Sequence, residues 1–302
     1  MRAAVPIVLL LGACSGPSAM PDAAPRVDAA LPTELPLRLS ETGLYTDLAA
    51  KLVDDRMTPY TPRYELWADG AAKQRWISLP PDAVIDKTDP DHWLFPIGTM
   101  WFKEFSRDGK RLETRLVWRV ADTGDRERDT LFGAYVWNDD ETEAMFAKAG
   151  ALDIRGTAHD APSADECWKC HIGEPGRALG YSAVQLDPYA APNAALGYLH
   201  GNCGHCHNPD GSAWSSSSMV LRLAIADTDA TTAAAATTTV GAPLQQWLGH
   251  GFTSRIAPGD PEASALLYRM AQRTIGTQMP PLATEMPDDA GIAVVRQWIE
   301  AL

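Results

Sequence analysis

Two short stretches of this chain combine thiols and imidazoles at one repeated spacing. Residues 167–171 read Cys-Trp-Lys-Cys-His and residues 203–207 read Cys-Gly-His-Cys-His, so both match C-x-x-C-H. Covalent attachment of haem needs two thiols at the separation of its two vinyl groups, which a helical turn provides, and an adjacent histidine that reaches the iron. The spacing therefore predicts two covalently bound haem c groups. Their attachment sites would be Cys167, Cys170, Cys203 and Cys206, and their axial ligands His171 and His207.

The cysteine count points the same way. The chain has 302 residues and five cysteines, of which four belong to the two motifs and the fifth is Cys14. No thiol is left for a structural disulfide, although an oxidising compartment would permit one. Two motifs that use every cysteine beyond Cys14 indicate haem more strongly than a single motif would.

Two other interpretations of the cysteines compete with haem. A zinc ribbon would bind one metal ion with all four thiols, but residues 171–202 put 32 positions between the two pairs, where about 15 to 20 are usual. Residues 203–206 also match the Cys-Gly-His-Cys dithiol of protein disulfide isomerases, which shuttles oxidising equivalents. Those domains carry the dithiol on a thioredoxin-like β-α-β unit, and no such pattern flanks it here. A thiol–disulfide oxidoreductase is therefore the weaker alternative.

The sixth ligand of the second haem is expected near the end of the chain. Residues 278–281 read Gln-Met-Pro-Pro, and in class I cytochromes c a Met-Pro-Pro loop just before the last helix delivers a thioether to the iron. Met279 is therefore the predicted ligand, and Met286, also followed by a proline, is the second candidate. A thioether stabilises ferrous iron and raises the reduction potential relative to a second histidine.

The first haem has no such loop. Residues 156–189 contain the first motif but no Met-Pro pair after it, so the sixth ligand must come from elsewhere in the chain or be absent. His159 is near in sequence and lies in a loop punctuated by Gly and Pro, which makes it the leading candidate against a role as a surface or capping residue. Three further histidines are less well placed: His92, His200 and His250.

The N-terminus resembles a bacterial lipoprotein signal peptide over residues 1–14. Its apolar run is too short to span a bilayer. Residues 11–14 read Leu-Gly-Ala-Cys, similar to a lipobox, which implies cleavage before Cys14 and acylation of its thiol. Ser15, rather than Asp, follows Cys14. In a Gram-negative cell this resembles the pattern of lipoproteins that are sorted to the outer membrane. Residues 15–36, rich in Pro and Ala, are expected to be a flexible tether, so the protein is expected to be lipid-anchored in the cell envelope, facing the periplasm or the surface.

The C-terminal part, residues 190–302, resembles a small, mainly α-helical class I cytochrome c domain. A helix through residues 194–199 is expected to lead into the second motif. The last helix is expected to start near Asp288 or Asp289 and to pack against that first helix. Asp260 followed by Pro261 predicts the start of a helix between the two.

Residues 37–155 have a different character, with six tryptophans among short alternating runs. An Asp-Gly turn at 108–109 separates residues 100–105 from 112–120, which is typical of a hairpin. Several such runs predict an all-β sandwich or barrel with a tryptophan-rich core; a concave aromatic face for a sugar or peptide is the alternative use of these rings. The expected fold is thus a mixed, multi-domain chain, all-β and then mainly α. The tryptophans are Trp67, Trp76, Trp93, Trp101, Trp118 and Trp137.

Several segments outside the motifs add a resemblance to a family of bacterial dihaem c-type cytochrome lipoproteins. They are residues 66–71, 95–99, 112–115, 198–203 and 258–261, together with the Met-Pro-Pro loop. The resemblance implies the fold and the two haems, and it says little about a substrate.

The charge of the chain narrows its partners. With 39 acidic and 26 basic side chains the formal charge is -13, which opposes binding to nucleic acid or to an anionic membrane surface and favours a basic redox partner protein. Electron transfer in the bacterial cell envelope is the function these features favour. A dihaem peroxidase-like enzyme with an open first haem is the alternative, and a non-redox binding module is the weakest. The sequence reveals no acid–base set beside the first motif, which favours a carrier over a catalyst.

Overall fold

The computed structural model describes residues 31–125, 128–186 and 188–302, so the predicted signal peptide and Cys14 lie outside the described residues. In these residues the strands precede residue 147 and the α-helices follow residue 163. The strands are β1 (Tyr45–Asp47), β2 (Leu52–Val53), β3 (Thr58–Pro59), β4 (Ala72–Ser78), β5 (Met100–Arg107), β6 (Lys110–Arg119), β7 (Thr130–Trp137) and β8 (Ala144–Phe146). The helices are η1 (Leu39–Glu41), η2 (Ile154–Gly156), α1 (Ala164–His171), α2 (Ala183–Leu186), α3 (Ala194–Asn202), α4 (Trp214–Ser217), α5 (Ala234–Thr237), α6 (Ala265–Met270) and α7 (Asp289–Glu300).

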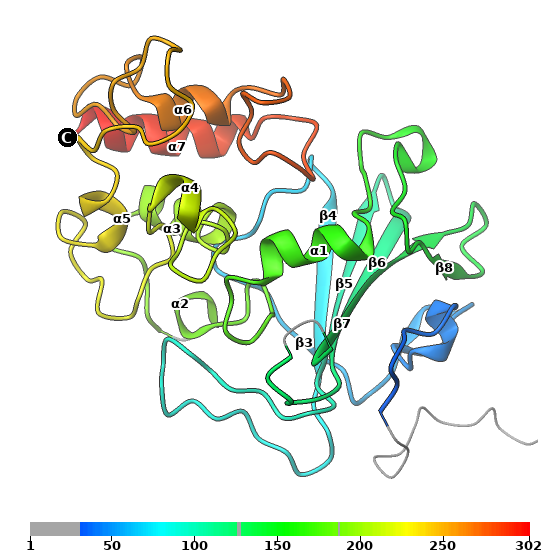
Figure 1. The fold of residues 1–302 in the computed structure, drawn as a ribbon. Helices are drawn as coiled ribbons and strands as arrows, with labels where there is room; N and C mark the ends of the chain where they lie inside the picture. Colours follow the sequence, from blue (N-terminus) through cyan, green and yellow to red (C-terminus); the bar gives the residue numbers. More distant parts are fainter. Residues whose placement is uncertain (1–30, 126–127, 187) are drawn as a thin grey trace, which may run out of the picture.

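A six-stranded antiparallel sheet forms one half of the molecule, and most of the helices form the other (Figure 1). The strand order is β3-β4-β5-β6-β7-β8, so each strand pairs with the next one in the sequence. The predicted hairpin is confirmed: β5 pairs with β6, and Lys103 lies opposite Arg115. Asp108 and Gly109 join the two strands with φ angles of 52° and 75°, the pair of positive values that a tight hairpin turn requires.

The expected sandwich or barrel is not formed. The sheet is open, because β3 and β8 lie at its opposite edges, and the other sheet in the described part of the chain is the two-stranded ribbon of β1 and β2. Segments without long strands cover both faces of the large sheet. Its apolar faces are therefore buried without a second full sheet.

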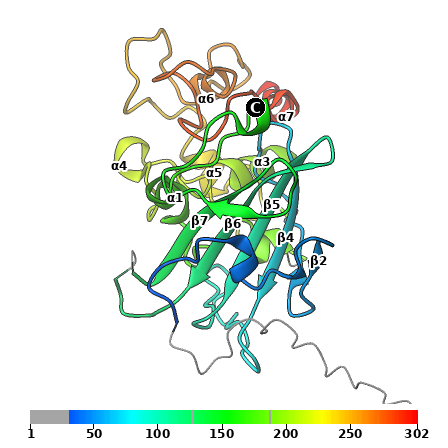
Figure 2. The same cartoon turned by 90° about the vertical axis from the view of Figure 1, so that its right-hand side faces the viewer.

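The two faces of the sheet have different covers. Phe102, Leu116 and Tyr135 pack against Leu39 and Leu44 of the N-terminal segment, which crosses in front of the strands in Figure 2. The opposite face packs against α1 and the loops around it. On that face the sheet contributes Ile77, Trp101, Val117 and Phe132, and the cover includes Trp93, Phe95, Cys167 and Trp168.

Core packing is the main use of the tryptophans. Five of the six have exposed fractions of 2–8% and belong to the two apolar layers on the sheet; they are Trp76, Trp93, Trp101, Trp118 and Trp137. Trp67 is half-buried, and its indole N–H donates a hydrogen bond of 2.9 Å to the carbonyl of Met286. It therefore ties a loop of the sheet half to the segment before α7.

Helices α3 and α7 form the centre of the helical half. The side chain of Asn193 caps α3 by accepting from the Leu196 N–H at 2.8 Å, and Asp288 caps α7 by accepting from the Gly291 N–H at 3.0 Å. The predicted start of the last helix is confirmed. A Cβ atom on Gly291 would lie 2.1 Å from the Tyr198 ring, so only glycine allows the helices to approach this closely.

The start predicted at Asp260 is wrong. Helix α6 begins at Ala265, after Ser264 in the N-cap position. The carboxylate of Asp260 accepts instead from the Ala263 N–H at 3.1 Å, within the turn that precedes the helix. The Asp-Pro pair therefore ends a loop rather than starting the helix.

The sheet and the helices share an interface built by residues 60–70. The Tyr64 ring lies so close to Gly197 that a Cβ atom there would be 2.2 Å from it. The Trp67 N–H donates to the Asn202 side-chain carbonyl at 2.7 Å, and the Asp69 carboxylate accepts from the Met286 N–H at 2.9 Å. The segments predicted as separate domains therefore form a continuous structure. None of the helices described combines the length and apolarity needed to cross a membrane.

Candidate functional site

The first motif lies on α1, which is positioned against the sheet. Ser163 and Glu166 form a reciprocal capping box at its N-terminus, the local signal that starts a helix at this point. The helix ends at His171, whose ring lies 4.9 Å from the Phe132 ring of β7, between centroids. His171 Nδ1 donates to the Arg177 carbonyl at 2.5 Å, so its Nε2 is the nitrogen left for a metal.

The second motif follows α3 directly. The helix ends at Asn202, and the next turn is closed by a 2.9 Å bond from the His207 N–H to the Cys203 carbonyl. His207 Nδ1 donates to the Ser217 hydroxyl oxygen at 3.0 Å, and this hydroxyl donates to the Ala213 carbonyl at 3.0 Å. As in the first motif, the bond at Nδ1 fixes the ring and leaves Nε2 for iron.

Burial keeps both motif histidines neutral. It lowers the pKa of His171 to about 3 and that of His207 to about 4, from an ordinary value of 6.5. A neutral imidazole has the lone pair that a metal requires, whereas the protonated ring has none. Both side chains are therefore in the protonation state that ligation needs.

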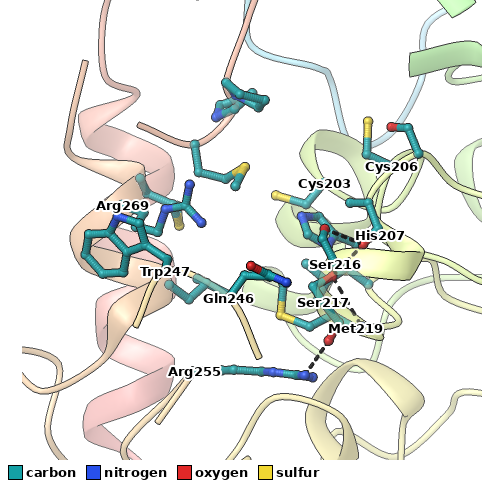
Figure 3. A pocket seen from close by; sticks show the side chains of 18 of the residues that line it. Cys203, Cys206, His207, Ser216, Ser217, Met219, Gln246, Trp247, Arg255 and Arg269 are labelled. Atoms are coloured by element: carbon teal, nitrogen blue, oxygen red, sulfur yellow. Dashed lines mark hydrogen bonds between the residues drawn. The ribbon is translucent and has the colours of Figure 1, made fainter. Parts of the chain in front are cut away.

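A cavity of about 560 Å³ lies beside the second motif. This volume falls in the range of about 300–1,000 Å³ that is usual for pockets of sizeable organic ligands. Figure 3 shows Cys203 and His207 on one wall and Trp247 and Arg269 on the opposite wall. Met279 also lines the cavity, and its backbone N–H bonds to the Arg269 carbonyl at 3.0 Å, which ties the Met-Pro-Pro loop to the end of α6.

Two arginines line the same cavity without an acidic partner. Arg255 donates to the carbonyls of Ser217 and Thr238, and Arg269 donates to the carbonyls of Thr277 and Gln278. Among the residues described, neither forms an ion pair with a carboxylate, and burial lowers the pKa of both. A ligand that brings carboxylates into this cavity would provide the missing counter-charge.

A smaller cavity, of about 100 Å³, lies beside the first motif, between the sheet and the helical half. Its walls include His171, Lys103, Arg115 and His159. His159 is thus placed on the same cavity as His171, but its Nε2 is bonded to the buried Glu113 carboxylate at 2.7 Å. Ligation of iron by His159 would therefore use Nδ1, or would require this bond to break.

The other candidate ligands lie away from both cavities. His92 is exposed and pairs with Asp89 at 2.9 Å, and His250 is exposed and stacks on Trp247 with ring centroids 4.1 Å apart. The buried His200 accepts a bond of 3.0 Å from the Leu223 N–H. The Met286 side chain is 42% exposed and is not among the lining residues of either cavity.

The two motifs meet where α1 ends. The sulfur atoms of Cys170 and Cys206 and a ring nitrogen of His205 all lie within 4.8 Å of one another. Cys170 and His205 belong to the walls of both cavities. A Cβ atom on Gly173 would lie 2.0 Å from the His205 carbonyl oxygen, so the glycine after α1 permits this close contact.

The thiol arrangement bears on the two rival interpretations. A four-thiol zinc ribbon would bring all four sulfurs together, whereas the cluster found in the described residues unites Cys170 and Cys206 with His205 and leaves out Cys167 and Cys203. A dithiol oxidoreductase relies on a thiol with a lowered pKa next to its motif partner. Burial instead raises the pKa of Cys203 to about 12, and the pKa of Cys206 is lowered first by its hydrogen bond with Cys170 of the other motif.

Covalent haem fits the second cavity in volume and in donor set. Both cysteines of the second motif line the cavity, with a neutral histidine whose Nδ1 is engaged and two arginines that lack counter-charges. Three methionines line it too: Met219, Met270 and the predicted ligand Met279. The first cavity matches in its donors, but its volume of about 100 Å³ is below the usual range.

Several residues of these cavities carry no signal in the sequence analysis. His205 occupies a variable position between the two cysteines of the second motif, and Arg255 and Arg269 lie far in the sequence from the motif whose cavity they line. Lys103 on β5 and Arg115 on β6 fit the ordinary alternation of a strand. Only the pairing of these two strands places both charges in one cavity. A search for charged residues at inward-facing strand positions could have found these two.

Comparison of the chain with protein-family models, with curated proteins and with solved structures found no match in any of the three.

Proposed function

We propose that this chain is a dihaem c-type cytochrome that transfers electrons in the bacterial cell envelope. The observation that carries the proposal is the meeting of the two motifs, with Cys170 on both cavities and next to Cys206. Cys170 belongs to one attachment site and Cys206 to the other, so the two cofactors would be held at neighbouring positions. A pair of neighbouring redox centres in one chain suits a relay.

The residues have distinct roles in this proposal. The four motif cysteines would hold the haems, and His171 and His207 would ligate iron through Nε2 while Nδ1 is bonded to oxygen. Met279, which lines the cavity of the second motif, is proposed as the sixth ligand of the second haem, and His159 is proposed for the first haem. Haem supplies a one-electron couple between ferric and ferrous iron.

A buried acid–base set supports a second candidate, a dihaem peroxidase-like enzyme. His159 and Glu113 are 3% and 0% exposed and are bonded to each other, and Arg115 pairs with Glu113 at 2.5 Å. His159 and Arg115 line the cavity of His171, and Glu113 is bonded to both of them. The sequence did not reveal this set, and its apparent absence there favoured a carrier. If His159 does not ligate iron, it could move protons for a small ligand at an open first site.

The location and partner of the protein belong to the same proposal. The lipobox-like segment at Cys14 would anchor it to a membrane of the cell envelope, through acyl chains rather than a spanning helix. The formal charge of -13 would favour a redox partner with a basic contact surface.

The proposal is tested by haem content in a host with a c-type maturation system. The alkaline pyridine assay should give about two haems per chain, and covalent haem staining should survive denaturation. Cys167→Ala/Cys170→Ala and Cys203→Ala/Cys206→Ala should each retain about one. A colourless protein with four free or zinc-bound thiols would refute the proposal.

A further inference from the structure

A lysine without a partner lies in the wall of the first-motif cavity. Lys103 is on β5, directly opposite Arg115 on β6, and both side chains line the cavity with His171. No hydrogen bond or ion pair involves Lys103 Nζ in the described part of the chain. The Phe105 ring lies near it, at 5.7 Å from Nζ to the centroid. Lys103 is half-buried, and a charge that has lost part of its water without gaining a counter-ion is unfavourable, so an anion would complete the site.

The charged groups around Lys103 leave it uncompensated. Three cations surround it, and two carboxylates are already paired with them: Lys73 and Arg75 bond Glu65 at 3.5 Å and 3.0 Å, and Arg115 bonds Glu113 at 2.5 Å. Asp69 and Asp160 also belong to the cavity wall. Their carboxylates accept from backbone N–H groups of residues 285–286 and 153, and no ion pair joins either of them to Lys103.

The local field at Lys103 is consequently positive. Burial first, and then repulsion by Arg75, Arg115 and Lys73, hold the pKa of Lys103 well below its usual range. Attraction by the Glu113 carboxylate opposes these effects only in part, so an anion next to Nζ would offset them further.

The size of the cavity limits what that anion can be. A volume of about 100 Å³ has room for a small anion or for one carboxylate group of a larger ligand. We propose that Lys103 and Arg115 bind a carboxylate or a small oxyanion in the first-motif cavity. Two sources supply this chemistry: a propionate of the first haem, in which case the inference rests on the proposed function, or a free oxyanion such as nitrite or formate.

The test compares three substitutions in the full-length protein loaded with haem. Lys103→Met removes the charge, and the variant should fold, because an apolar side chain of similar length can replace a charged group that has no ion-pair partner. Lys103→Arg keeps the charge. Lys110→Met removes an exposed charge from the same hairpin. The midpoint potential of each haem is measured by spectroelectrochemistry, and the ferric protein is titrated with nitrite and with formate, with chloride as the control for ionic strength.

The two sources give different results. If a propionate is bound, Lys103→Met should change the redox equilibrium of the first haem at least tenfold, about 59 mV for one electron, towards a lower potential. The potential should fall because a nearby cation favours the reduced iron, which has one positive charge fewer, and Lys103→Met removes that cation. The potential of the second haem should change little in all three variants. The potential of the first haem should change little in Lys103→Arg and in Lys110→Met. If a free oxyanion is bound, nitrite or formate should saturably shift the first-haem spectrum, and Lys103→Met should weaken that affinity at least tenfold.

The proposal is overturned if Lys103→Met alters neither the first-haem potential nor the response to either anion. This result differs from failure of the proposed function, which would appear as absence of covalent haem in every variant. In that case calorimetric titration of nitrite and formate into the haem-free wild type and Lys103→Met still decides whether the site binds an anion.

Discussion

The two C-x-x-C-H motifs have the same spacing but different surroundings. The second lies among helices and loops that come mostly from residues 203–282, around a cavity of about 560 Å³. The first lies between α1 and the sheet, beside a cavity of about 100 Å³ whose walls come from residues 60–117, 159–179 and 280–284 and from His205. The second site is therefore largely local in the sequence, whereas the first is assembled from distant segments.

This difference has a chemical consequence. The second cavity offers three thioethers, Met279 among them, and two arginines whose hydrogen bonds go to carbonyls. The first offers a charged set on strands, with Glu113 bonded to His159 and Lys103 left without a partner. The same spacing of cysteines and histidine thus lies beside two different sets of side chains. In the proposed function, the set at the second motif would suit electron transfer, and the set at the first could move protons or bind an anion.

Removal of Met279 should give the largest effect on the second site. Met279→Ala should abolish the weak sulfur-to-iron band at the red end of the oxidised spectrum, and should lower the second-haem potential by about 59 mV or more, a tenfold change in the redox equilibrium. The potential falls because the thioether stabilises ferrous iron. Absorption spectra and a redox titration measure both.

Met286→Ala is the matched control, since that side chain is 42% exposed and lies outside both cavities. If the band survives in Met279→Ala and is lost in Met286→Ala, the ligand is Met286 and the contrast between the two cavities loses its main support.

Substitution of His159 decides how the first site differs from the second. If His159 closes the sixth position, the wild-type first haem should be low-spin and unreactive towards carbon monoxide, and His159→Ala should make it high-spin and reactive. The second haem is the same in both proteins, so the difference between their spectra reports the first haem alone. A first haem that binds carbon monoxide equally well in both would favour the peroxidase-like alternative.

Glu113→Gln sharpens the same test. It keeps His159 in place but removes the carboxylate that accepts from its ring at 2.7 Å. If His159 ligates iron, the spin state should not change and the first-haem potential should rise, because a less basic imidazole stabilises ferric iron less. An unchanged potential would indicate that His159 is not a ligand.

Acid is expected to have a smaller effect, which is a loss of folding stability through protonation of His200 in the helical half. Burial lowers the pKa of His200 to about 3, from 6.5, so between these values the unfolded chain binds a proton that the folded chain excludes. Stability from the neutral ring is therefore complete above about pH 6.5 and is lost as the pH falls towards 3. From pH 7 to pH 5 the loss should be about 2 kcal/mol.

His200→Gln is the control for this prediction, because an amide oxygen can still accept from the Leu223 N–H and does not titrate. Urea unfolding at pH 7 and pH 5 should show the wild type losing about 2 kcal/mol more than the variant. Equal losses would mean that protonation of His200 does not limit acid stability.

Patterns that depend on neighbouring residues were readable in the sequence. The cap at Asp288, the helix before Cys203 and the hairpin at Asp108-Gly109 all formed where they were predicted, because caps, helical periodicity and tight turns are set within a few residues. The open form of the sheet was not predicted. The open form depends on which distant segments pack against each face of the sheet. The alternation of residues along a strand shows which side chains face inwards, but not which segment packs against them.

The sequence by itself determined the two motifs, the spacing of thiols and histidine in each, and the Met-Pro-Pro loop as a separate feature. Only the tertiary structure brought Cys170 next to Cys206 and gave His171 and His207 their oxygen partners at Nδ1. It also placed Lys103 and Arg115 inside a cavity with His159. The physical reason is that motif spacing fixes distances along one turn of chain, whereas burial, charge pairing and cavity walls arise from contacts between residues as far apart as Glu113 and His159 or Asp69 and Met286.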